Sequence, residues 1–486
     1  MLAGAIVFVC SAAVLMLEIL AGRLLAPYVG ISLETYTSII GTVLAGIALG
    51  AWAGGRVADR IDAHRLLGPV IALGGVLALC TVPIVRHLGG STGEGVSAST
   101  LTLSFAAFFL PAVVLSSVTP MVVKLQLHQL SSTGGVVGRL SGISTAGALV
   151  GTFVTGFVLV ATTPTRTIID AIGITLVVLG LVLTLALWRR HTPVIALIVV
   201  LAAGGFTWSV TSSEPCQVES AYYCMRVEHD PFRASGRILW LDNVRHSYVD
   251  LADPEYLEFD YTRSFADAVN TAFPAGRPLD ALHIGGGGFT FPRYLAATRP
   301  GSRSTVLEID PAVLDLGRDE LGLRTSRALQ VRIGDARLGI RDQPDHSRDL
   351  VVGDAFGSLS VPWHLTTREF LREVDRVLRP EGVYVQNVID YPSFRFARAQ
   401  LATLRERFEH VVAVAPQSVF DDQAGANVVL VASHRPIDPT QLRRLVAVHG
   451  DVVVDGATLD RFIDHAPVIT DDFAPVDQWL REDSAP

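Results

Sequence analysis

Long apolar runs separated by short polar loops fill the first part of the chain, and each run is about twenty residues long, enough for a helix to cross a hydrocarbon core of ~30 Å. The pattern predicts about seven spans, at residues 3–22, 36–54, 67–85, 99–118, 141–161, 168–188 and 193–211. The first run lacks a basic leader and a small-residue cleavage site, so we expect it to remain as a span. Residues 1–212 are therefore expected to form a multi-span α-helical membrane domain in contact with lipid.

The pattern changes after residue 212. Residues 218–251 alternate apolar and polar positions in short runs, which predicts a small antiparallel sheet within a domain at 213–260. From residue 261 to 486 strand and helix patterns alternate. The predicted strands are 279–284, 304–309, 328–333, 348–353, 382–388, 410–415 and 426–432. The predicted helices are 261–273, 289–298, 311–321, 366–378, 393–408 and 438–448. This order predicts an α/β, Rossmann-like domain with a mostly parallel sheet, whose ligands bind at the carboxyl ends of the strands.

Basic residues in the short loops predict the orientation of the spans. The loops after spans two, four and six contain Arg56, Arg60, Arg65, Lys124, Arg139, Arg189 and Arg190. The opposite loops contain Arg23, Arg86 and Arg166. This asymmetry places the amino terminus in the cytoplasm and, after seven spans, the second half of the chain outside the cell membrane.

Two cysteines bear on the same question. Cys216 and Cys224 lie eight positions apart in a predicted β-hairpin just beyond the seventh span. A disulfide between them would fit an oxidising exterior, whereas two unpaired thiols would leave the side open. Both interpretations stand at this point.

Composition limits the kinds of ligand. The chain of 486 residues is 50% hydrophobic, with a formal net charge of −8 and a mean hydropathy of +0.41. The acidic residues are concentrated in the second half, which argues against a nucleic-acid partner and favours a cationic ligand. No His, Cys, Asp or Glu cluster has metal-ligand spacing, so we expect no metal site.

A glycine loop follows the first predicted parallel strand. Gly285, Gly286, Gly287 and Gly288 end an apolar strand, and Glu308 ends the next strand about twenty residues later. Glycines let the backbone approach a ligand, and a carboxylate at the second strand tip accepts hydrogen bonds from ribose hydroxyls. Asp335 and Ala336 follow the third strand, where they would meet the adenine edge. Asp335 is equally suited to cap a helix, and the two roles are compatible.

Asp354 follows the fourth predicted strand, beside the expected adenosine pocket. A carboxylate there is suited to act as general base for an amine nucleophile, whose neutral form is scarce at pH 7. The alternative is that Asp354 caps a turn. His246 and His364 could line the same pocket, although a single histidine is more often structural.

These motifs together resemble the spermidine synthase family, the polyamine aminopropyltransferases. The resemblance covers about residues 218–432. It rests on Glu-Ser-x-Tyr at 219–222, Leu-Asp-x-Val at 241–244, Tyr-x-Glu at 256–258, the glycine loop, Leu-Glu-Ile-Asp-Pro-Ala-Val at 307–313, Gly-Asp-Ala at 334–336, Asp354, Glu-Phe-Leu at 369–371 and Leu-Arg-Pro-Glu-Gly at 378–382. The amino-terminal half, with Gly-Gly-Arg-Val-Ala-Asp-Arg at 54–60 between spans two and three, resembles the first half of a major facilitator transporter. The whole chain is therefore similar to a fused membrane form of spermidine synthase.

The resemblance implies a methyltransferase-like fold that uses decarboxylated S-adenosylmethionine, or S-adenosylmethionine, as a co-substrate and contains no prosthetic group. The donor's aminopropyl group would pass to putrescine or a related amine, and a homodimer is expected. Three residues, Tyr223, Tyr256 and Glu258, would bind the amine. Glu308 and Asp335 would hold the ribose and the adenine, and Asp354 would be the base.

The chain also departs from the family pattern. Gly288 stands where the family loop has an aspartate that holds the donor's ammonium group, and Gly357 stands where a second acid follows Asp354. Tyr223 and Leu257 replace an expected glutamine and histidine. A second hypothesis is therefore a transporter-like or sensory membrane protein with a catalytically degenerate adenosyl-binding domain. S-adenosylmethionine-type ligands are cytosolic, so the enzyme hypothesis also conflicts with an exterior second half.

Two charged groups in the first half could have functions of their own. Glu18 lies inside the first span, where an ionisable group is a candidate substrate or proton site. The alternative is a structural pair with an arginine such as Arg23. Asp59 is expected to pair with Arg56 and Arg60 and so to order a cytoplasmic loop.

Overall fold

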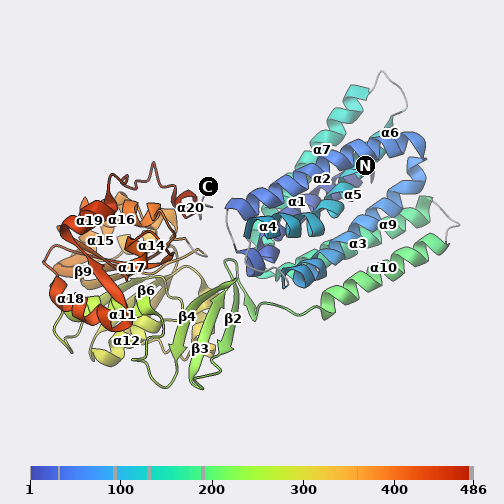
Figure 1. The fold of residues 1–486 in the computed structure, drawn as a ribbon. Helices are drawn as coiled ribbons and strands as arrows, with labels where there is room; N and C mark the ends of the chain where they lie inside the picture. Colours follow the sequence, from blue (N-terminus) through green and yellow to red (C-terminus); the bar gives the residue numbers. More distant parts are fainter. Residues whose placement is uncertain are drawn as a thin grey trace. The chain divides into compact units, whose positions relative to one another are not determined.

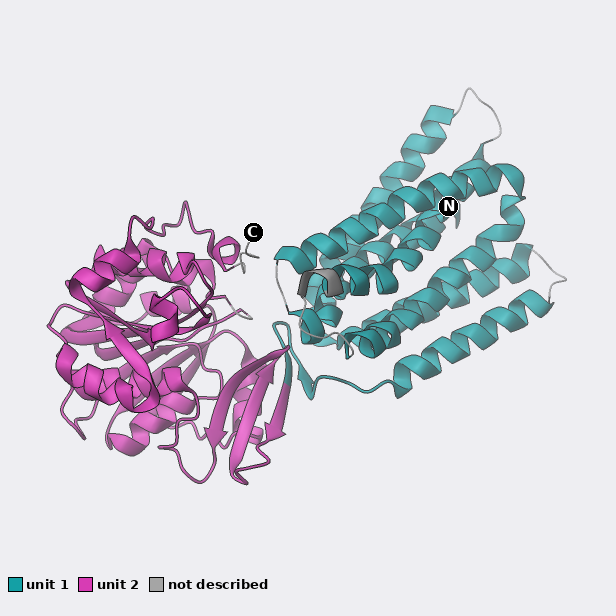
Figure 2. Cartoon of the chain, in the orientation of Figure 1, with its two compact units in different colours: residues 1–225 teal, residues 226–486 magenta. Residues whose placement is uncertain are grey.

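The computed structural model describes residues 2–30, 33–90, 96–127, 133–187, 192–357 and 360–480. The chain divides into two compact units, residues 1–225 and residues 226–486 (Figure 2). The predicted boundaries at 212 and 260 are finer than this division. The three-domain partition therefore stays a prediction.

Unit 1 is helical, as predicted. Within the described residues, 7 helices are long and apolar enough to cross a membrane, namely Leu2–Val29, Leu33–Arg60, Ala63–Gly89, Thr100–Gln126, Thr133–Thr162, Thr165–Leu187 and Pro193–Thr211. The fourth consists of α4 (Val96–Ser104), η1 (Phe105–Phe109), α5 (Leu110–Ser116) and α6 (Val118–Gln126). The fifth consists of α7 (Thr133–Val154), η3 (Thr155–Leu159) and α8 (Val160–Thr162). All seven coincide with the predicted spans, and most extend beyond them.

Glycines let pairs of these helices approach closely. In α3 (Ala63–Gly89) and α9 (Thr165–Leu187), a Cβ added to Gly75 would lie 2.6 Å from the carbonyl oxygen of Gly173, and one added to Gly180 would lie 2.6 Å from that of Gly68. Membrane helices associate through such small residues, because lipid offers no hydrophobic drive between them. Unit 1 also exposes large apolar side chains such as Trp52 and Phe157, which fits a multi-pass membrane protein.

The charged groups of unit 1 pair differently from the predictions. Arg23 in α1 (Leu2–Val29) forms an ion pair with Glu219 at 3.0 Å, so the predicted pair with Glu18 is wrong. Among the described residues Glu18 has no hydrogen-bond or ion-pair partner. Asp59 pairs with Lys124 at 2.8 Å instead of with its neighbouring arginines, because α6 brings Lys124 beside it.

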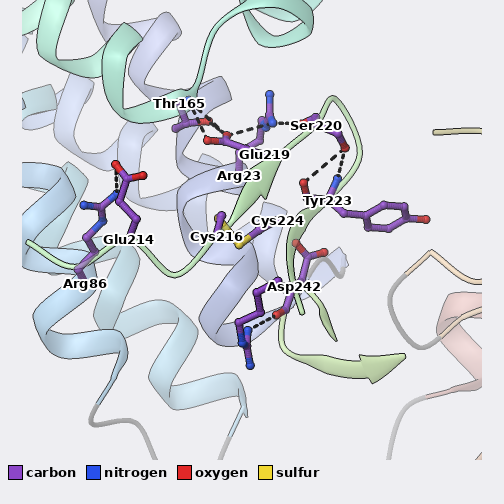
Figure 3. Close-up of a disulfide and its surroundings, with 11 residues drawn as sticks. Arg23, Arg86, Thr165, Glu214, Cys216, Glu219, Ser220, Tyr223, Cys224 and Asp242 are labelled. Atoms are coloured by element: carbon purple, nitrogen blue, oxygen red, sulfur yellow. Dashed lines mark hydrogen bonds and ion pairs between the residues drawn. A yellow bond between two sulfur atoms is a disulfide. The ribbon is translucent and has the colours of Figure 1, made fainter. Parts of the chain in front are cut away.

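A disulfide joins Cys216 and Cys224 and thereby confirms the bridged interpretation (Figure 3). It closes the hairpin formed by β1 (Val218–Glu219) and the start of β2 (Cys224–His229). Ion pairs tie this segment to the helix ends, since Glu214 bonds Arg166 at 2.5 Å and lies 3.6 Å from Arg86. Arg23 pairs with Glu219. All three arginines of the predicted exterior loops, Arg23, Arg86 and Arg166, therefore lie beside carboxylates.

Two sheets follow the helices. The small sheet is antiparallel, as predicted, with the order β1-β2-β3-β4, where β3 is Gly236–Leu241 and β4 is Val244–Asp250. The large sheet of unit 2 has eight strands in the order β12-β10-β11-β9-β8-β5-β6-β7. Its strands are β5 (Asp280–Ile284), β6 (Arg303–Glu308), β7 (Leu329–Ile333), β8 (Arg348–Gly353), β9 (Leu378–Asp390), β10 (His410–Pro416), β11 (Ala426–Ser433) and β12 (Asp451–Val454).

The large sheet is mixed. Strands β7, β6, β5, β8 and β9 pair in parallel. Beyond β9, three antiparallel pairs follow: β9 with β11, β11 with β10, and β10 with β12. The prediction of a mostly parallel sheet holds for the glycine-loop side and is wrong for the other side. The segment between β10 and β11, residues 417–425, is too short for the crossover that a parallel pair needs, so these two strands pair antiparallel. Strand β12, at the antiparallel edge, was not predicted.

Helices cover both faces of the large sheet (Figure 1). One face buries a core against α14 (Ala336–Arg341), α15 (Arg368–Val377), α16 (Arg395–Arg405) and α19 (Gly456–Ile463). The other face packs against α11 (Asp260–Ala272), α12 (Thr290–Thr298) and α18 (Pro439–Val446). The remaining elements are α2 (Leu33–Arg60), α10 (Thr192–Thr211), α13 (Pro311–Asp319), η4 (Trp363–Leu365), α17 (Gln417–Phe420), η5 (Ala447–His449) and α20 (Val476–Trp479).

Candidate active site

The glycine loop lies between β5 and α12, at the carboxyl end of the parallel strands. Gly285 and Gly287 have φ of 95° and 48°, and Phe289, which precedes α12, has φ of 56°. Residues with a side chain rarely adopt such a backbone conformation, so glycine is favoured at positions 285 and 287, whereas Phe289 adopts it at some cost in strain. A Cβ on Gly285 would also collide with the backbone of Asp354. The loop and the strand end that carries Asp354 are therefore in direct contact.

Glu308 ends β6 directly beside this loop. Its buried carboxylate accepts hydrogen bonds from the backbone N–H of Gly286 at 2.7 Å and of Asp310 at 2.9 Å. Each carboxylate oxygen keeps a further lone pair, so the group can still accept bonds from two vicinal hydroxyls. Burial raises the pKa of Glu308, while hydrogen bonds from backbone N–H groups lower it. The geometry fits the predicted ribose-binding role.

Asp335 performs the helix-capping role that the sequence suggested. It accepts hydrogen bonds from the backbone N–H of Arg337 and Leu338 and so caps α14, while Ala336 is buried behind it. Its other oxygen lies 3.1 Å from Nε2 of His364. Asp335 sits at the end of β7, two strands from the glycine loop. The predicted contact of Asp335 and Ala336 with adenine stays a prediction.

Gly288 packs against β4. Its N–H donates to the hydroxyl of Ser247 at 3.0 Å, and a Cβ at this position would lie 2.9 Å from Cβ of Ser247 and 3.0 Å from Cγ2 of Val249. An aspartate therefore does not fit here without a shift of β4. The packing of the loop against β4 therefore favours glycine over an acidic residue at position 288.

Asp354 lies at the carboxyl end of β8. Its Oδ1 accepts a hydrogen bond from the side-chain amide of Asn387 at 3.0 Å, and its Oδ2 accepts one from the hydroxyl of Tyr261 at 3.1 Å. Burial raises the pKa of Asp354 to about 6, although both hydrogen bonds lower it. Both oxygens thus bond side chains, which argues against the turn-capping alternative. A carboxylate with such a pKa can take up a proton near neutral pH.

A cavity of about 440 Å³ opens beside Asp354. Three further carboxylates line it, those of Glu258, Asp260 and Asp451. The cationic side chain that lines it is Arg245, which lies 3.3 Å from Glu258. A smaller cavity of about 30 Å³ joins Asp354 to the four glycines of the loop. The predicted base thus stands between the glycine loop and an acidic cavity.

The predicted amine-binding residues are placed unequally. Glu258 lines the large cavity. Tyr256 does not, and its hydroxyl donates to Glu258 at 2.6 Å, so it supports that carboxylate from behind. Tyr223 belongs to unit 1, where its carbonyl oxygen accepts the backbone N–H of Ser220. The amine-binding roles of all three stay predictions.

Some residues of the site were not found from the sequence. Tyr261, Asn387, Asn427 and Asp451 all line the large cavity. A signal was present for Asn387, because it and Gln386 place two amides among the apolar residues of a strand segment that is predicted to be buried. His246 lines both cavities, and burial lowers its pKa to about 4, so it is neutral at pH 7. Within the described residues no group of three or more His, Cys, Asp or Glu could hold a metal ion.

Part of this chain is similar to known proteins. A family model described as a methyltransferase domain matches residues 282–386. A polyamine aminopropyltransferase of Vibrio vulnificus is 36% identical over 113 residues, which are 23% of this chain and 38% of that protein. Unit 2 has a methyltransferase-like fold, and its sequence is homologous to polyamine aminopropyltransferases.

Two further comparisons extend this result. Polyamine aminopropyltransferase 2 of Streptomyces coelicolor is 25% identical over 400 residues, 77% of this chain and 71% of that protein. That alignment is longer than the whole of unit 2, so it includes part of unit 1. A crystal structure of a probable spermidine synthase from Corynebacterium glutamicum is 27% identical, with a TM-score of 0.49, and covers 52% of this chain and 95% of that one.

Proposed function

We propose that this chain is a membrane-bound aminopropyltransferase in which Asp354 is the general base. The observation that carries the proposal is the position of Asp354 between the glycine loop and an acidic cavity. Its pKa of about 6 supports the assignment, because a general base works best when its pKa is near the operating pH. Homology to polyamine aminopropyltransferases supports the reaction type.

In the proposed reaction, decarboxylated S-adenosylmethionine binds with its ribose hydroxyls on Glu308. A neutral amine nitrogen attacks the aminopropyl carbon next to the sulfonium sulfur, so that a C–N bond forms and the C–S bond breaks. The electron pair of that bond goes to sulfur and leaves methylthioadenosine as a neutral thioether. Asp354 takes the proton that the amine loses. Positioning and this one proton transfer account for most of the rate.

Catalysis and binding can be separated experimentally. The full-length protein, purified in detergent, is expected to bind methylthioadenosine and to release it from decarboxylated S-adenosylmethionine when putrescine or a longer amine is added. The Asp354→Asn variant should still bind methylthioadenosine but should no longer release it from decarboxylated S-adenosylmethionine. If the protein binds no adenosyl sulfonium or thioether, the proposal fails.

A specific observation favours a second candidate, a transporter-like or sensory protein with a degenerate binding domain. Glu18 lies in α1 without a partner among the described residues, and an ionisable group in a membrane helix marks a functional site by default. Gly288 has also lost the family's acid. This candidate predicts that Glu18→Gln impairs the cellular function and that Asp354→Asn leaves it intact.

We further propose that the carboxyl-terminal half lies outside the cytoplasm. Three observations support this side. The loops after spans two, four and six, which lie on the other side of the membrane in this orientation, hold the excess of basic residues. Cys216 and Cys224 form a disulfide, and Arg23, Arg86 and Arg166 pair with carboxylates. Because S-adenosylmethionine-type ligands are cytosolic, this placement favours the second candidate, and the aminopropyltransferase would need an adenosyl donor on the outer face of the membrane. A homodimer stays a prediction from the family.

A thiol reagent that cannot cross the membrane tests the side. In intact cells it should label Cys216 and Cys224 only after reduction with an impermeant reductant. Labelling that appears only after the cells are opened would place the half in the cytoplasm.

A further inference from the structure

The large cavity is floored by the antiparallel part of the sheet. Alternate residues of a strand share a face, so the strand register sets which side chains line the floor together. The floor is formed by two rows across strands β9, β11, β10 and β12. The first row is Asn387, Val429 and Val414, and the second is Ile389, Asn427, Pro416 and Asp451. The cavity therefore runs across four strands, away from the glycine loop.

The length of this floor exceeds that of a short diamine. Three spacings of ~4.8 Å separate β9 from β12, so the floor extends about 14 Å from Asn387 to the strand that carries Asp451. Three extended single bonds reach ~3.6 Å, so the nitrogens of a four-carbon diamine lie about 6 Å apart and the end nitrogens of a triamine with three- and four-carbon arms about 11 Å apart. A four-carbon diamine held at Asp354 would not reach the far end.

The two ends of the floor have matching charges. Asp354 accepts hydrogen bonds from the neutral groups of Tyr261 and Asn387. At the far end the buried Asp451 accepts one from the hydroxyl of Ser264 at 2.8 Å. Each end therefore presents a carboxylate to the cavity whose hydrogen-bond donors are neutral.

His449 does not cancel the charge at the far end. It lies 2.8 Å from Asp267 and 3.6 Å from Asp451, so even as a cation it faces two carboxylates. The three groups then retain a net negative charge. Burying such a charge without a partner is costly, and a ligand cation would remove that cost. The apolar side chains between the ends, Val414, Val429 and Ile389, suit methylene groups.

We propose that the amine acceptor is an elongated polyamine with at least three nitrogens, whose distal ammonium group binds at Asp451. This inference rests on the proposed aminopropyl transfer and names its acceptor class. Asp451 acts as a specificity-determining residue, and Asn387 and Asn427 line the path between the two ends. The side chain of Asn427 donates to Asn387 at 2.9 Å, which continues the hydrogen-bonded chain from Asp354 along the floor.

The test uses the full-length protein in detergent with decarboxylated S-adenosylmethionine. Release of methylthioadenosine is measured with putrescine, with spermidine and with linear diamines of four to eight carbons. For the unchanged protein, kcat/KM should rise with length and be about tenfold or more higher for spermidine than for putrescine, because a further ion contact is made. A preference for putrescine over the longer amines would overturn the inference and leave the aminopropyl transfer standing.

A matched pair of variants locates the far end. Asp451→Asn should raise KM for spermidine about tenfold, with kcat and the values for putrescine nearly unchanged. Asp421→Asn removes a carboxylate that is exposed and outside the cavity, so it should change neither. Methylthioadenosine binding reports whether each variant is folded. An equal loss for both amines in a variant that still binds methylthioadenosine would contradict the distal site, and no release with any amine would refute the proposed function itself.

Discussion

The side-chain amide of Asn387 donates a hydrogen bond to Oδ1 of Asp354 over 3.0 Å. Burial raises the pKa of Asp354 to about 6. The hydrogen bond stabilises the ionised carboxylate and so lowers this pKa, but its effect is smaller than that of burial. Because the base must be ionised, kcat/KM should rise with pH through about 6 and then level off until another group titrates. A rate that is flat between pH 5 and 7 would contradict the assignment.

Replacement of Asn387 should shift the pH range over which kcat/KM rises, the acidic limb of the pH profile. Asn387→Ala removes a donor to the ionised form, so the pKa of Asp354 should rise and the acidic limb should shift upward by about one pH unit. The measurement is the pH dependence of kcat/KM at saturating donor. Gln441→Ala removes an amide that is exposed and lies outside the cavity, and it should leave the limb in place.

The same raised pKa has a consequence for stability. The folded-state pKa of Asp354 lies above its ordinary value of 3.8, so its contribution is fully present below about pH 4 and is lost as the pH rises through about 6. Asp354→Asn removes the titrating carboxyl group, and with it the loss of stability that accompanies its ionisation. The variant should therefore gain thermal stability relative to the unchanged protein at pH 7.5, and the gain should disappear near pH 4. An equal difference in Tm at both pH values would show that Asp354 is not the titrating group.

Loss of the base should act on turnover. Asp354→Asn is expected to lower kcat about 10²- to 10⁴-fold, the usual contribution of a positioned base, while the Kd for methylthioadenosine changes little. Isothermal titration and release assays on the same sample separate the two effects. Loss of binding and turnover together would indicate a structural role.

Glu308 should act on binding. Its carboxylate bonds the glycine loop and is placed to accept ribose hydroxyls, so Glu308→Gln should weaken methylthioadenosine binding about tenfold or more. Asp319→Asn changes an exposed carboxylate on the helix that follows and serves as the control. Equal affinities for the Glu308→Gln variant and this control would exclude the ribose role.

Gly288 should resist restoration of the family's acid. Gly288→Asp places a Cβ within 3.0 Å of both Ser247 and Val249, so it should lower stability by about 1–3 kcal/mol. Gly357→Ala adds a Cβ with no atom within 4 Å and is the matched control. Thermal unfolding of unit 2 measures both. A Gly288→Asp variant as stable as the control would show that the loop is not closed by β4.

The sequence predicted much of this structure because its strongest signals are local. The length of the apolar runs alone located the seven helices. The alternation of apolar and polar positions located the small sheet, and the alternation of strand and helix patterns located the parallel strands. The antiparallel edge was missed because strand direction depends on how the chain returns, which apolar runs do not encode. The pairing of Asp59 with Lys124 and of Arg23 with Glu219 likewise joins positions far apart in the chain.

The candidate site divides in the same way. Asp354, Glu308 and the glycines follow strands and could be located from spacing, whereas Asp451 enters the cavity only because β12 pairs with β10. Tyr261 was missed because it lies in the first turn of an ordinary amphipathic helix and its contact with Asp354 is long-range. Residues that reach the cavity only through long-range pairing or packing therefore cannot be identified from a single sequence.

The most direct test of the account is release of methylthioadenosine by the purified full-length protein supplied with decarboxylated S-adenosylmethionine and a polyamine. The account predicts release that depends on the amine, forms one aminopropylated amine for each methylthioadenosine, and is abolished in Asp354→Asn. Binding of the donor with no product from any amine, or product formed equally by Asp354→Asn, would contradict it.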